Sequence, residues 1–251
     1  MASPKAAIAN SLDANAWLAS ALGRACYQLR LGTPLGEDDQ TGRLMRALAS
    51  DSVFIDAKLP VNRLDLTGDL EVHGFRLIDT NLRLARPARP QEARSIPGVT
   101  VRPAEPPDRF GVESLARRSF QSSRFHADPQ IASDKADDIK ARWAGNFFKG
   151  ARGDHMMVAE TAGVVVGFLQ VLAPGGGLLV IDLIAVAASH RGLGIATAMI
   201  AAAENDCGAP SQLSVGTQLA NTASIALYQR DGFQVDDAQY VFHFHGTRSR
   251  P

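Results

Sequence analysis

A glycine-rich turn in the C-terminal half of this 251-residue chain has the composition of an anion-binding site. An apolar run at 178–186 precedes it and an Ala/Met/Ile-rich run at 197–204 follows it, which predicts a buried strand, a turn and a helix. The first amides of a helix lack intrahelical partners and carry partial positive charge, so glycines there let a phosphate approach the bare backbone. The alternative is a tight turn that needs glycine only for its dihedral angles. The residues of this candidate pyrophosphate site are Arg191, Gly192, Leu193, Gly194, Ile195, Ala196 and Thr197.

Two common phosphate-binding loops do not match this turn. A dinucleotide-binding fingerprint requires a third glycine where Thr197 stands, and an acidic residue at the end of the next strand, which here ends in Gly216 and Thr217. A P-loop requires Lys followed by Ser or Thr after its last glycine, and neither follows Gly194. What remains is the order Arg-x-x-Gly-x-Ala behind an apolar strand.

A second motif follows the turn in sequence. After a predicted strand at 212–217, residues 221–233 read Asn-Thr-Ala-Ser-Ile-Ala-Leu-Tyr-Gln-Arg-Asp-Gly-Phe. Together the two motifs resemble the acetyl-CoA-binding motif and the Asn…Ala…Leu-Tyr…Gly-Phe signature of the GNAT acetyltransferase superfamily. The resemblance implies an α/β (α+β) fold, in which a central mixed, mostly antiparallel sheet is flanked by helices.

Three further segments make the resemblance narrower. Ser-Arg-Phe-His-Ala-Asp at 123–128, Trp143…Asn146 and Gly-Thr-Gln at 216–218 are similar to the TDP-fucosamine N-acetyltransferase family of bacterial surface-polysaccharide synthesis. Members of that family acetylate the amine of a nucleotide-linked 4-amino-4,6-dideoxy sugar from acetyl-CoA. The resemblance therefore implies acetyl-CoA as cosubstrate and a nucleotide sugar as the small-molecule amine.

The resemblance also assigns roles around the cofactor. Acyl transfer from a thioester requires a polarised carbonyl, and the central strand at Ile184, Ala185 and Val186 would pair with the amide-bearing pantetheine arm as an added strand. The 191–197 turn would bind the pyrophosphate, and Asn221 and Ser224 would complete the cofactor contacts.

Three residues are candidates for the chemistry itself. Tyr228 lies seven residues after Asn221, so both lie on one helix face, and its phenol could protonate the leaving thiolate. Asn221 could orient the thioester, cap the helix, or do both. Asp182 interrupts an apolar strand, where a charge is costly without a role or a partner, so it is either a general base or a structural ion-pair partner.

The acceptor site is expected around the polar and aromatic segment before the central sheet. Arg124 could bind phosphates bidentately, an aromatic side chain could stack on a base or sugar, and His126 is an alternative base. The predicted acceptor-site residues are Arg124, Phe125, His126, Trp143 and Phe147.

The domain organisation is read from composition and periodicity. Pro87, Pro90 and Pro97 interrupt any periodic apolar face, so 87–98 is predicted to be a linker between a small α/β domain at 1–86 and the acetyltransferase domain at 99–246, with a polar tail at 247–251. A helix at 64–73, then Gly-Phe and a strand at 75–84, repeat the order in which a GNAT domain ends. The N-terminal piece is therefore interpreted as a degenerate half-repeat, which leaves a homodimer open.

Composition excludes some classes of function. Lys+Arg and Asp+Glu are both 26, so no basic surplus exists for nucleic acid or an anionic membrane. Neither Cys26 nor Cys207 lies in a metal-ligand spacing, and no metal is expected. The sequence shows neither a signal peptide nor a membrane-spanning run, which predicts a cytoplasmic protein.

Two other functions remain open from the sequence. The chain could be a GNAT acetyltransferase for another small amine or a protein N-terminus. It could also be a non-catalytic acyl-CoA-binding module, although such a module would need none of the proton chemistry that Tyr228, Asn221 and Asp182 offer.

Overall fold

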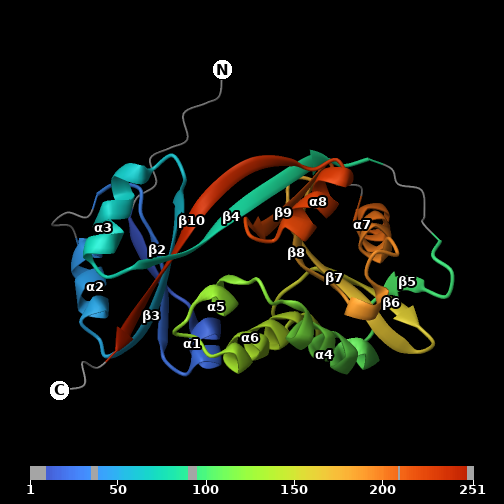
Figure 1. Cartoon of the computed structure of the whole chain (residues 1–251), viewed down its shortest axis with the longest axis horizontal. Helices are drawn as coiled ribbons and strands as arrows, with labels where there is room; N and C mark the ends of the chain where they lie inside the picture. The colour runs from blue at the N-terminus through green and yellow to red at the C-terminus, as the bar shows by residue number, and fades with distance from the viewer. Residues whose placement is uncertain (1–9, 35–38, 90–94, 209, 248–251) are drawn as a thin grey trace. The chain divides into compact units, whose positions relative to one another are not determined.

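The chain forms two compact units, which are shown in Figure 1. The computed structural model describes residues 10–34, 39–89, 95–208 and 210–247. Among these, unit 1 takes the residues up to 81 together with 127–131 and those from 237 onward, and unit 2 takes 82–126 and 132–236. Two segments that follow the start of unit 2 in sequence therefore belong to unit 1.

The predicted boundaries differ from these units in one respect. The boundary expected at residue 86 lies near the observed one at 81, but the domain expected at 99–246 included both segments that belong to unit 1. Parts of the expected linker, at 90–94, and of the expected tail, at 248–251, lie outside the described residues.

Unit 2 is built on a sheet in the order β4-β9-β8-β7-β6-β5. Strands β8 and β9 are parallel, whereas the pairs β7–β8, β6–β7 and β5–β6 are antiparallel. Its strands are β5 (Thr100–Pro103), β6 (His155–Thr161), β7 (Val164–Gly175), β8 (Leu178–Val186), β9 (Gln212–Gln218) and the second half of β4 (Arg76–Pro87). Its helices are α4 (Arg109–Ser119), α5 (Arg124–Ala127), α6 (Ser133–Gly145), α7 (Ile195–Asp206) and α8 (Thr222–Arg230).

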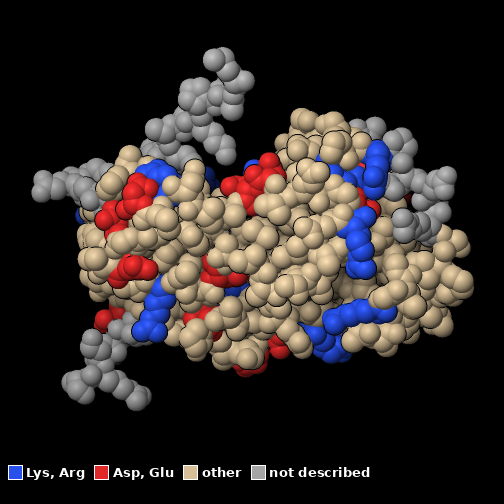
Figure 2. Space-filling model, turned by 45° about the horizontal axis from the view of Figure 1, so that its top comes forward, with Lys and Arg blue, Asp and Glu red and all other residues tan. Residues whose placement is uncertain are grey.

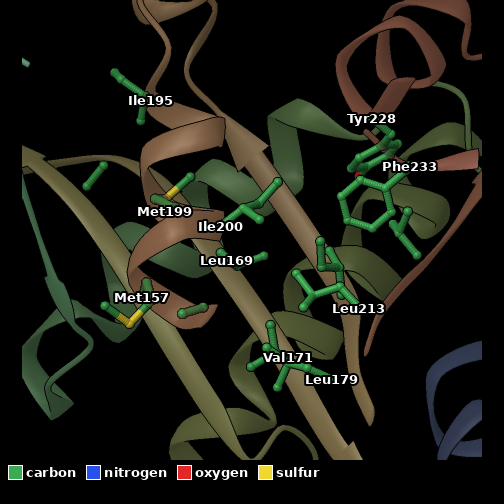
Figure 3. Packing of buried hydrophobic residues seen from close by; sticks show 14 of the residues in the cluster. Met157, Leu169, Val171, Leu179, Ile195, Met199, Ile200, Leu213, Tyr228 and Phe233 are labelled. Carbon is green, nitrogen blue, oxygen red and sulfur yellow. The ribbon is translucent and has the colours of Figure 1, made fainter. Parts of the chain in front are cut away.

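Helices cover both faces of this sheet, which explains why its central strands β7 and β8 are almost wholly apolar. Successive residues of β6 point to opposite faces: Met157 packs with Met199 of α7, whereas Met156 packs with Val112 and Leu115 of α4. Figure 3 shows the α7 side, where Met199 and Ile200 lie over side chains of β7, β8 and β9. The predicted buried strand at 178–186 is confirmed as β8.

Unit 1 has a smaller sheet whose strand order is β1-β2-β3-β10. Strands β2 and β3 are parallel, and the other two pairs are antiparallel. Its elements are β1 (Ser11–Ala14), α1 (Ala16–Leu22), β2 (Ala25–Arg30), α2 (Asp39–Leu48), β3 (Ser52–Pro60), α3 (Thr67–Val72), the first half of β4, and β10 (Gln234–Thr247) from residue 237.

The two units share one structural repeat. The order β2-α2-β3-α3-β4 in unit 1 matches β8-α7-β9-α8-β10, and the first and third elements of each series pair in parallel. In unit 1 the amide of Phe75 donates to the carbonyl of Leu70, and in unit 2 the amide of Phe233 donates to the carbonyl of Tyr228. The glycine before each phenylalanine has a φ near that of its counterpart, 83° and 87°. Unit 1 therefore repeats the end of unit 2, with Leu70 in place of Tyr228.

Both charge signs occur over the surface. On the face shown in Figure 2, acidic and basic side chains interrupt a mostly uncharged surface, consistent with their equal numbers of 26 in the sequence. Among the described residues, no helix is both long enough and apolar enough to span a bilayer.

Candidate active site

The glycine-rich turn adopts the conformation that an anion site requires. Gly192 and Gly194 have φ values of 80° and 82°, in the left-handed region that favours glycine, and Gly194 is the N-cap residue of α7. A Cβ added to either glycine would meet nothing within 4 Å, so backbone conformation rather than crowding explains both residues. The first turn of α7 contains no acidic residue, and the loop from Arg191 to Gly194 is exposed. The partial positive charge of the helix end thus faces open space.

Arg191 adds a permanent charge at this helix end. Its Nε donates to the carbonyl oxygen of Val186 at 3.2 Å, which ties the arginine to the last residue of β8. The remaining predicted residues of the turn are the exposed Leu193, the buried Ile195, and the partly buried Ala196 and Thr197 at the start of α7. The predicted pyrophosphate residues are therefore contiguous at one helix N-terminus.

Strands β8 and β9 stop pairing half-way along their length. Their parallel register runs from Leu178–Gln212 to Ile181–Val215 and ends there, although β8 continues to Val186 and β9 to Gln218. Residues 182–186 of β8 thus have a backbone edge that β9 does not cover. Because an unpaired strand edge offers amide and carbonyl groups to an added strand, this edge suits an amide-bearing ligand arm. It includes the predicted pantetheine residues Ile184, Ala185 and Val186.

Replacing Gly194 tests the turn. A β-branched residue is strained at a φ of 82°, so Gly194→Val is expected to raise the Kd for acetyl-CoA at least about tenfold, measured by calorimetry. Gly208→Val is the matched control, because Gly208 also has a positive φ, 74°, and equally open surroundings, but it lies beyond the C-terminal end of α7. Equal losses of affinity in both variants would contradict a specific role for the turn.

Asn221 and Tyr228 occupy the two ends of one helix face. The side-chain oxygen of Asn221 accepts a hydrogen bond of 3.3 Å from the amide of Ser224. Asn221 therefore caps α8, which is one of the two roles expected for it. Tyr228 is 2% exposed and packs edge-to-face on Phe233, with ring centroids 5.6 Å apart (Figure 3). Burial raises the pKa of the Tyr228 phenol well above its ordinary value, so the hydroxyl stays protonated at neutral pH.

Asp182 forms a structural ion pair, which is one of the two roles that its position in an apolar strand suggested. Its carboxylate accepts hydrogen bonds from Trp143 Nε1 at 2.9 Å, from Gln170 Nε2 at 2.9 Å, and from Arg152 Nε at 2.8 Å and Nη2 at 2.5 Å. Three of these bonds end on Oδ2 and one on Oδ1, so both oxygens of the buried carboxylate have partners. Asp182 is also the extra residue of a β-bulge, because the β7–β8 register passes from Gln170–Leu183 to Val171–Ile181.

The predicted acceptor residues fall into two groups. Trp143 and Phe147 lie by Asp182: a Cβ on Gly153, the residue after Arg152, would be 2.9 Å from Gln170 and 3.2 Å from Phe147. The guanidinium of Arg152 and the ammonium of Lys140 each lie 4.9 Å from the centre of the Trp143 ring. Two cationic groups therefore lie against the indole ring of Trp143.

The second group surrounds the short helix α5. Residues Arg124–Ala127 form a helical turn. Phe125 is 1% exposed and the Arg124 guanidinium lies 4.8 Å from the centre of its ring, so Phe125 lies in the core. That Phe125 contacts the acceptor stays a prediction. His126 is held by Ser123 Oγ at Nδ1, 2.6 Å, and by Asp137 at Nε2, 3.0 Å.

Sequence reasoning missed the residues that complete these groups. Gln170 offered a signal, since it is a polar residue in the apolar run of β7, as Asp182 is in β8. Arg152 offered none, because it lies in a short polar loop with no periodicity. Ser123 and Asp137 also gave no local signal.

Comparison with known proteins supports the sequence resemblance. The model of the GNAT acetyltransferase family matches residues 113–233. The spore coat polysaccharide biosynthesis protein SpsD of Bacillus subtilis (strain 168) is 33% identical over 164 residues, which cover 64% of this chain and 56% of that protein. The dTDP-fucosamine acetyltransferase of Escherichia coli O6:H1 is 26% identical over 187 residues, which cover 74% of this chain and 79% of that protein. The chain thus spans little more than half the length of the first relative.

Solved structures share the fold at low sequence identity. A conserved protein of unknown function from Staphylococcus epidermidis ATCC 12228 superposes with a TM-score of 0.65 at 13% identity, covering 96% of this chain and 93% of that one. A tandem GNAT protein from the clavulanic acid biosynthesis pathway superposes with a TM-score of 0.59 at 14% identity, covering 89% and 76%. The expected fold class is confirmed.

Proposed function

We propose that this protein transfers the acetyl group of acetyl-CoA to the amine of a nucleotide-linked amino-dideoxy sugar, because residues 113–233 match the model of the GNAT acetyltransferase family. The observation that carries the proposal is the end of β8–β9 pairing at Ile181 and Val215, together with the glycine turn between β8 and α7. The pantetheine arm would pair with β8 from residue 182 to 186, and the pyrophosphate would bind the amides of the turn beside Arg191. The domain needs both features together to bind a coenzyme A thioester.

The reaction is a direct transfer. The neutral amine attacks the thioester carbonyl carbon, the C–S bond breaks, and the departing thiolate takes the phenolic proton of Tyr228. The proton lost by the nitrogen passes to water, from which Tyr228 is reprotonated. The burial that raises the pKa of Tyr228 would also raise the pKa of a thiol beside it, so the two groups remain matched for proton transfer. Asn221 contributes by fixing the start of α8 and could hold the pantetheine through its amide.

The geometry favours water over either side chain as the base. Both oxygens of Asp182 accept hydrogen bonds, and Arg152 forms an ion pair with it. His126 has a partner on each ring nitrogen: if Nε2–H donates to Asp137, Nδ1 accepts from the hydroxyl of Ser123. Because both side chains are held by other protein groups, water is the favoured base.

The acceptor is proposed from the charges near Asp182 and from the relatives. Arg152 has a side-chain exposure of 39%, and its position over Trp143 places a fixed cation at the edge of the candidate site. A guanidinium in this position could bind the diphosphate of a nucleotide sugar. The two curated relatives are described as a polysaccharide biosynthesis protein and a dTDP-fucosamine acetyltransferase, which supports this acceptor class.

An assay of thiol release from acetyl-CoA tests the proposed function. The panel contains TDP-linked 3- and 4-amino-dideoxy sugars, the same sugars without nucleotide, polyamines and peptide N-termini. Turnover of one nucleotide-linked sugar, with a much higher KM for its nucleotide-free form, is the expected result. Turnover only on peptides or polyamines would indicate another amine substrate, and acetyl-CoA binding without any turnover would indicate a binding module.

Replacing Asp182 separates a positioning role from a base. Asp182→Asn keeps a carbonyl for Trp143 but breaks the ion pair with Arg152, so the KM for the acceptor is expected to rise about tenfold with kcat nearly unchanged. If Asp182 were the general base, the variant would instead lose about 10²–10⁴-fold in kcat, and the acidic limb of its pH profile would disappear. Asp206→Asn, which removes an exposed carboxylate from the end of α7, is the control.

A further inference from the structure

Three buried ionisable side chains form a cluster in unit 1 that the proposed reaction does not use. Asp128 Oδ2 lies 2.7 Å from His243 Nδ1 and 2.7 Å from His245 Nε2. The side-chain exposures of these residues are 1%, 0% and 2% respectively. Both histidines are on β10, whereas Asp128 belongs to the segment 127–131, which lies between α5 and α6 in sequence. Burying such groups is unfavourable unless their hydrogen bonds compensate for lost hydration.

Arg24 determines where the proton of His245 lies. Its Nη2 is 2.7 Å from His245 Nδ1, and a guanidinium can only donate, so Nδ1 accepts and the proton is on Nε2. His245 therefore donates to Asp128. Burial raises the pKa of the Asp128 carboxyl, but hydrogen bonds from His243, His245 and the amide of Gln130 outweigh burial and hold this pKa below its usual range. Asp128 is an ionised acceptor of several hydrogen bonds.

The same proton assignment argues against a metal centre at this cluster. Two histidines and a carboxylate are a set that binds divalent transition metals, and the ligand atoms lie within 4.8 Å of one another. A metal bound to His245 Nε2 would leave the proton on Nδ1, where metal-bound histidines donate to an acceptor. Here Nδ1 faces the donor of Arg24, so a metal would create a donor–donor clash.

The surroundings make the cluster rigid. The ring of Phe54 on β3 packs edge-on against His243 at 4.8 Å and His245 at 5.1 Å. Asp128 also shapes its own segment, since Oδ1 accepts from the amide of Gln130 at 2.9 Å and its carbonyl from the amide of Ile131 at 3.1 Å. The Asp128 side chain thus links segment 127–131 to strand β10.

We propose that Asp128 is a positioning residue, through which unit 1 anchors segment 127–131 and thereby fixes the preceding residues 124–126 of the acceptor region. The chain enters this segment directly from α5 and leaves it toward α6, so its anchorage restrains both ends. The repeat that has Leu70 in place of Tyr228 has no phenol for proton transfer, but its strand β3 supplies Phe54, which packs against both histidines. The effect on the acceptor rests on the proposed function, whereas the anchor itself does not.

Hydrogen exchange of the full-length protein tests the anchor independently of its substrate. Asp128→Asn keeps the shape but loses the charge, and amides at 121–131 are expected to exchange at least about tenfold faster while those of β8 and α7 do not change. Asp65→Asn removes an exposed carboxylate of unit 1 that pairs with Arg63, and should change neither region. Unchanged exchange at 121–131 in Asp128→Asn would overturn the proposal.

A conservative variant guards against a general loss of folding. His245→Gln retains an amide donor in place of Nε2–H, so the amides at 121–131 are expected to stay largely protected from exchange. His245→Leu has no donor and is expected to lose this protection. Equal losses of protection in the two variants would overturn the anchor. A rise in melting temperature with Zn²⁺ that Asp128→Asn abolishes would also overturn it, in favour of a metal site.

The acceptor effect has its own readout. With the acceptor found in the panel, Asp128→Asn is expected to raise the acceptor KM about tenfold at an unchanged Kd for acetyl-CoA. An equal rise in the acceptor KM and in the Kd for acetyl-CoA would overturn the positioning role. If no amino sugar is turned over, the proposed function fails while the exchange result still decides the anchor.

Discussion

Tyr228→Phe is expected to lower kcat for acetyl transfer by about 10²–10⁴-fold, the usual contribution of general acid catalysis. Phe fits the same buried position, because the tyrosine ring packs on Phe233 within the core of unit 2. The Kd for acetyl-CoA and the melting temperature should therefore stay close to those of the wild-type protein. The measurement is thiol release under saturating acetyl-CoA, with binding measured separately by calorimetry.

The pH profile of the wild-type enzyme provides a second check on Tyr228. Burial raises the pKa of this phenol, so its proton is present below that raised value and is lost only at more alkaline pH than for an exposed tyrosine, about 10. The rate should rise with pH as the amine loses its proton and then stay level to about pH 10. Tyr27→Phe, at a partly buried tyrosine of unit 1, is the control. Full activity of Tyr228→Phe would assign the leaving-group proton to water.

Arg86→Met is expected to lower the free energy of unfolding by about 3–5 kcal/mol, because it removes the guanidinium that pairs with the buried carboxylates of Glu204 and Asp231. Arg86 on β4 is 4% exposed and makes a bidentate ion pair with Glu204 of α7, at 2.8 and 2.7 Å, and a contact of 3.2 Å with Asp231 after α8. Its guanidinium also lies 4.9 Å from the centre of the Phe233 ring. Denaturant unfolding measures the loss.

The same strand offers a matched control for Arg86. Arg83 pairs with Asp236, but the two side chains are 47% and 48% exposed, so Arg83→Met should cost only about 0–1 kcal/mol. Replacing Arg86 and Glu204 together should cost less than the sum of the single replacements, since the pair is then removed rather than broken. Similar losses for Arg86→Met and Arg83→Met would contradict the buried network.

The Arg86 network also links stability to the candidate site. Glu204 lies on the helix that begins at the glycine turn, and Asp231 follows the helix that carries Tyr228. One guanidinium therefore holds the C-terminal ends of α7 and α8. Partial loosening in Arg86→Met should raise the Kd for acetyl-CoA at temperatures where the fold is still intact.

Local features of the candidate site could be predicted from the sequence alone. The strand at 178–186, the glycine turn and the cap at Asn221 depend on neighbours within a few residues, through apolar runs, left-handed φ values and side-chain capping. The repeated helix, Gly-Phe and strand in unit 1 was visible for the same reason. Those features predicted the fold class, and acetyl-CoA was proposed as cosubstrate from them.

Only the tertiary structure decided the roles of the remaining polar residues, because their partners come from distant parts of the chain. Asp182 accepts hydrogen bonds from Trp143, 39 residues before it, and from Arg152, 30 residues before it. Asp128 contacts His243 across 115 residues. Phe125, predicted to contact the acceptor, is buried. The sequence by itself predicted the elements and suggested the cofactor, whereas burial and long-range hydrogen bonding, which no local pattern encodes, decided the partners of the polar groups.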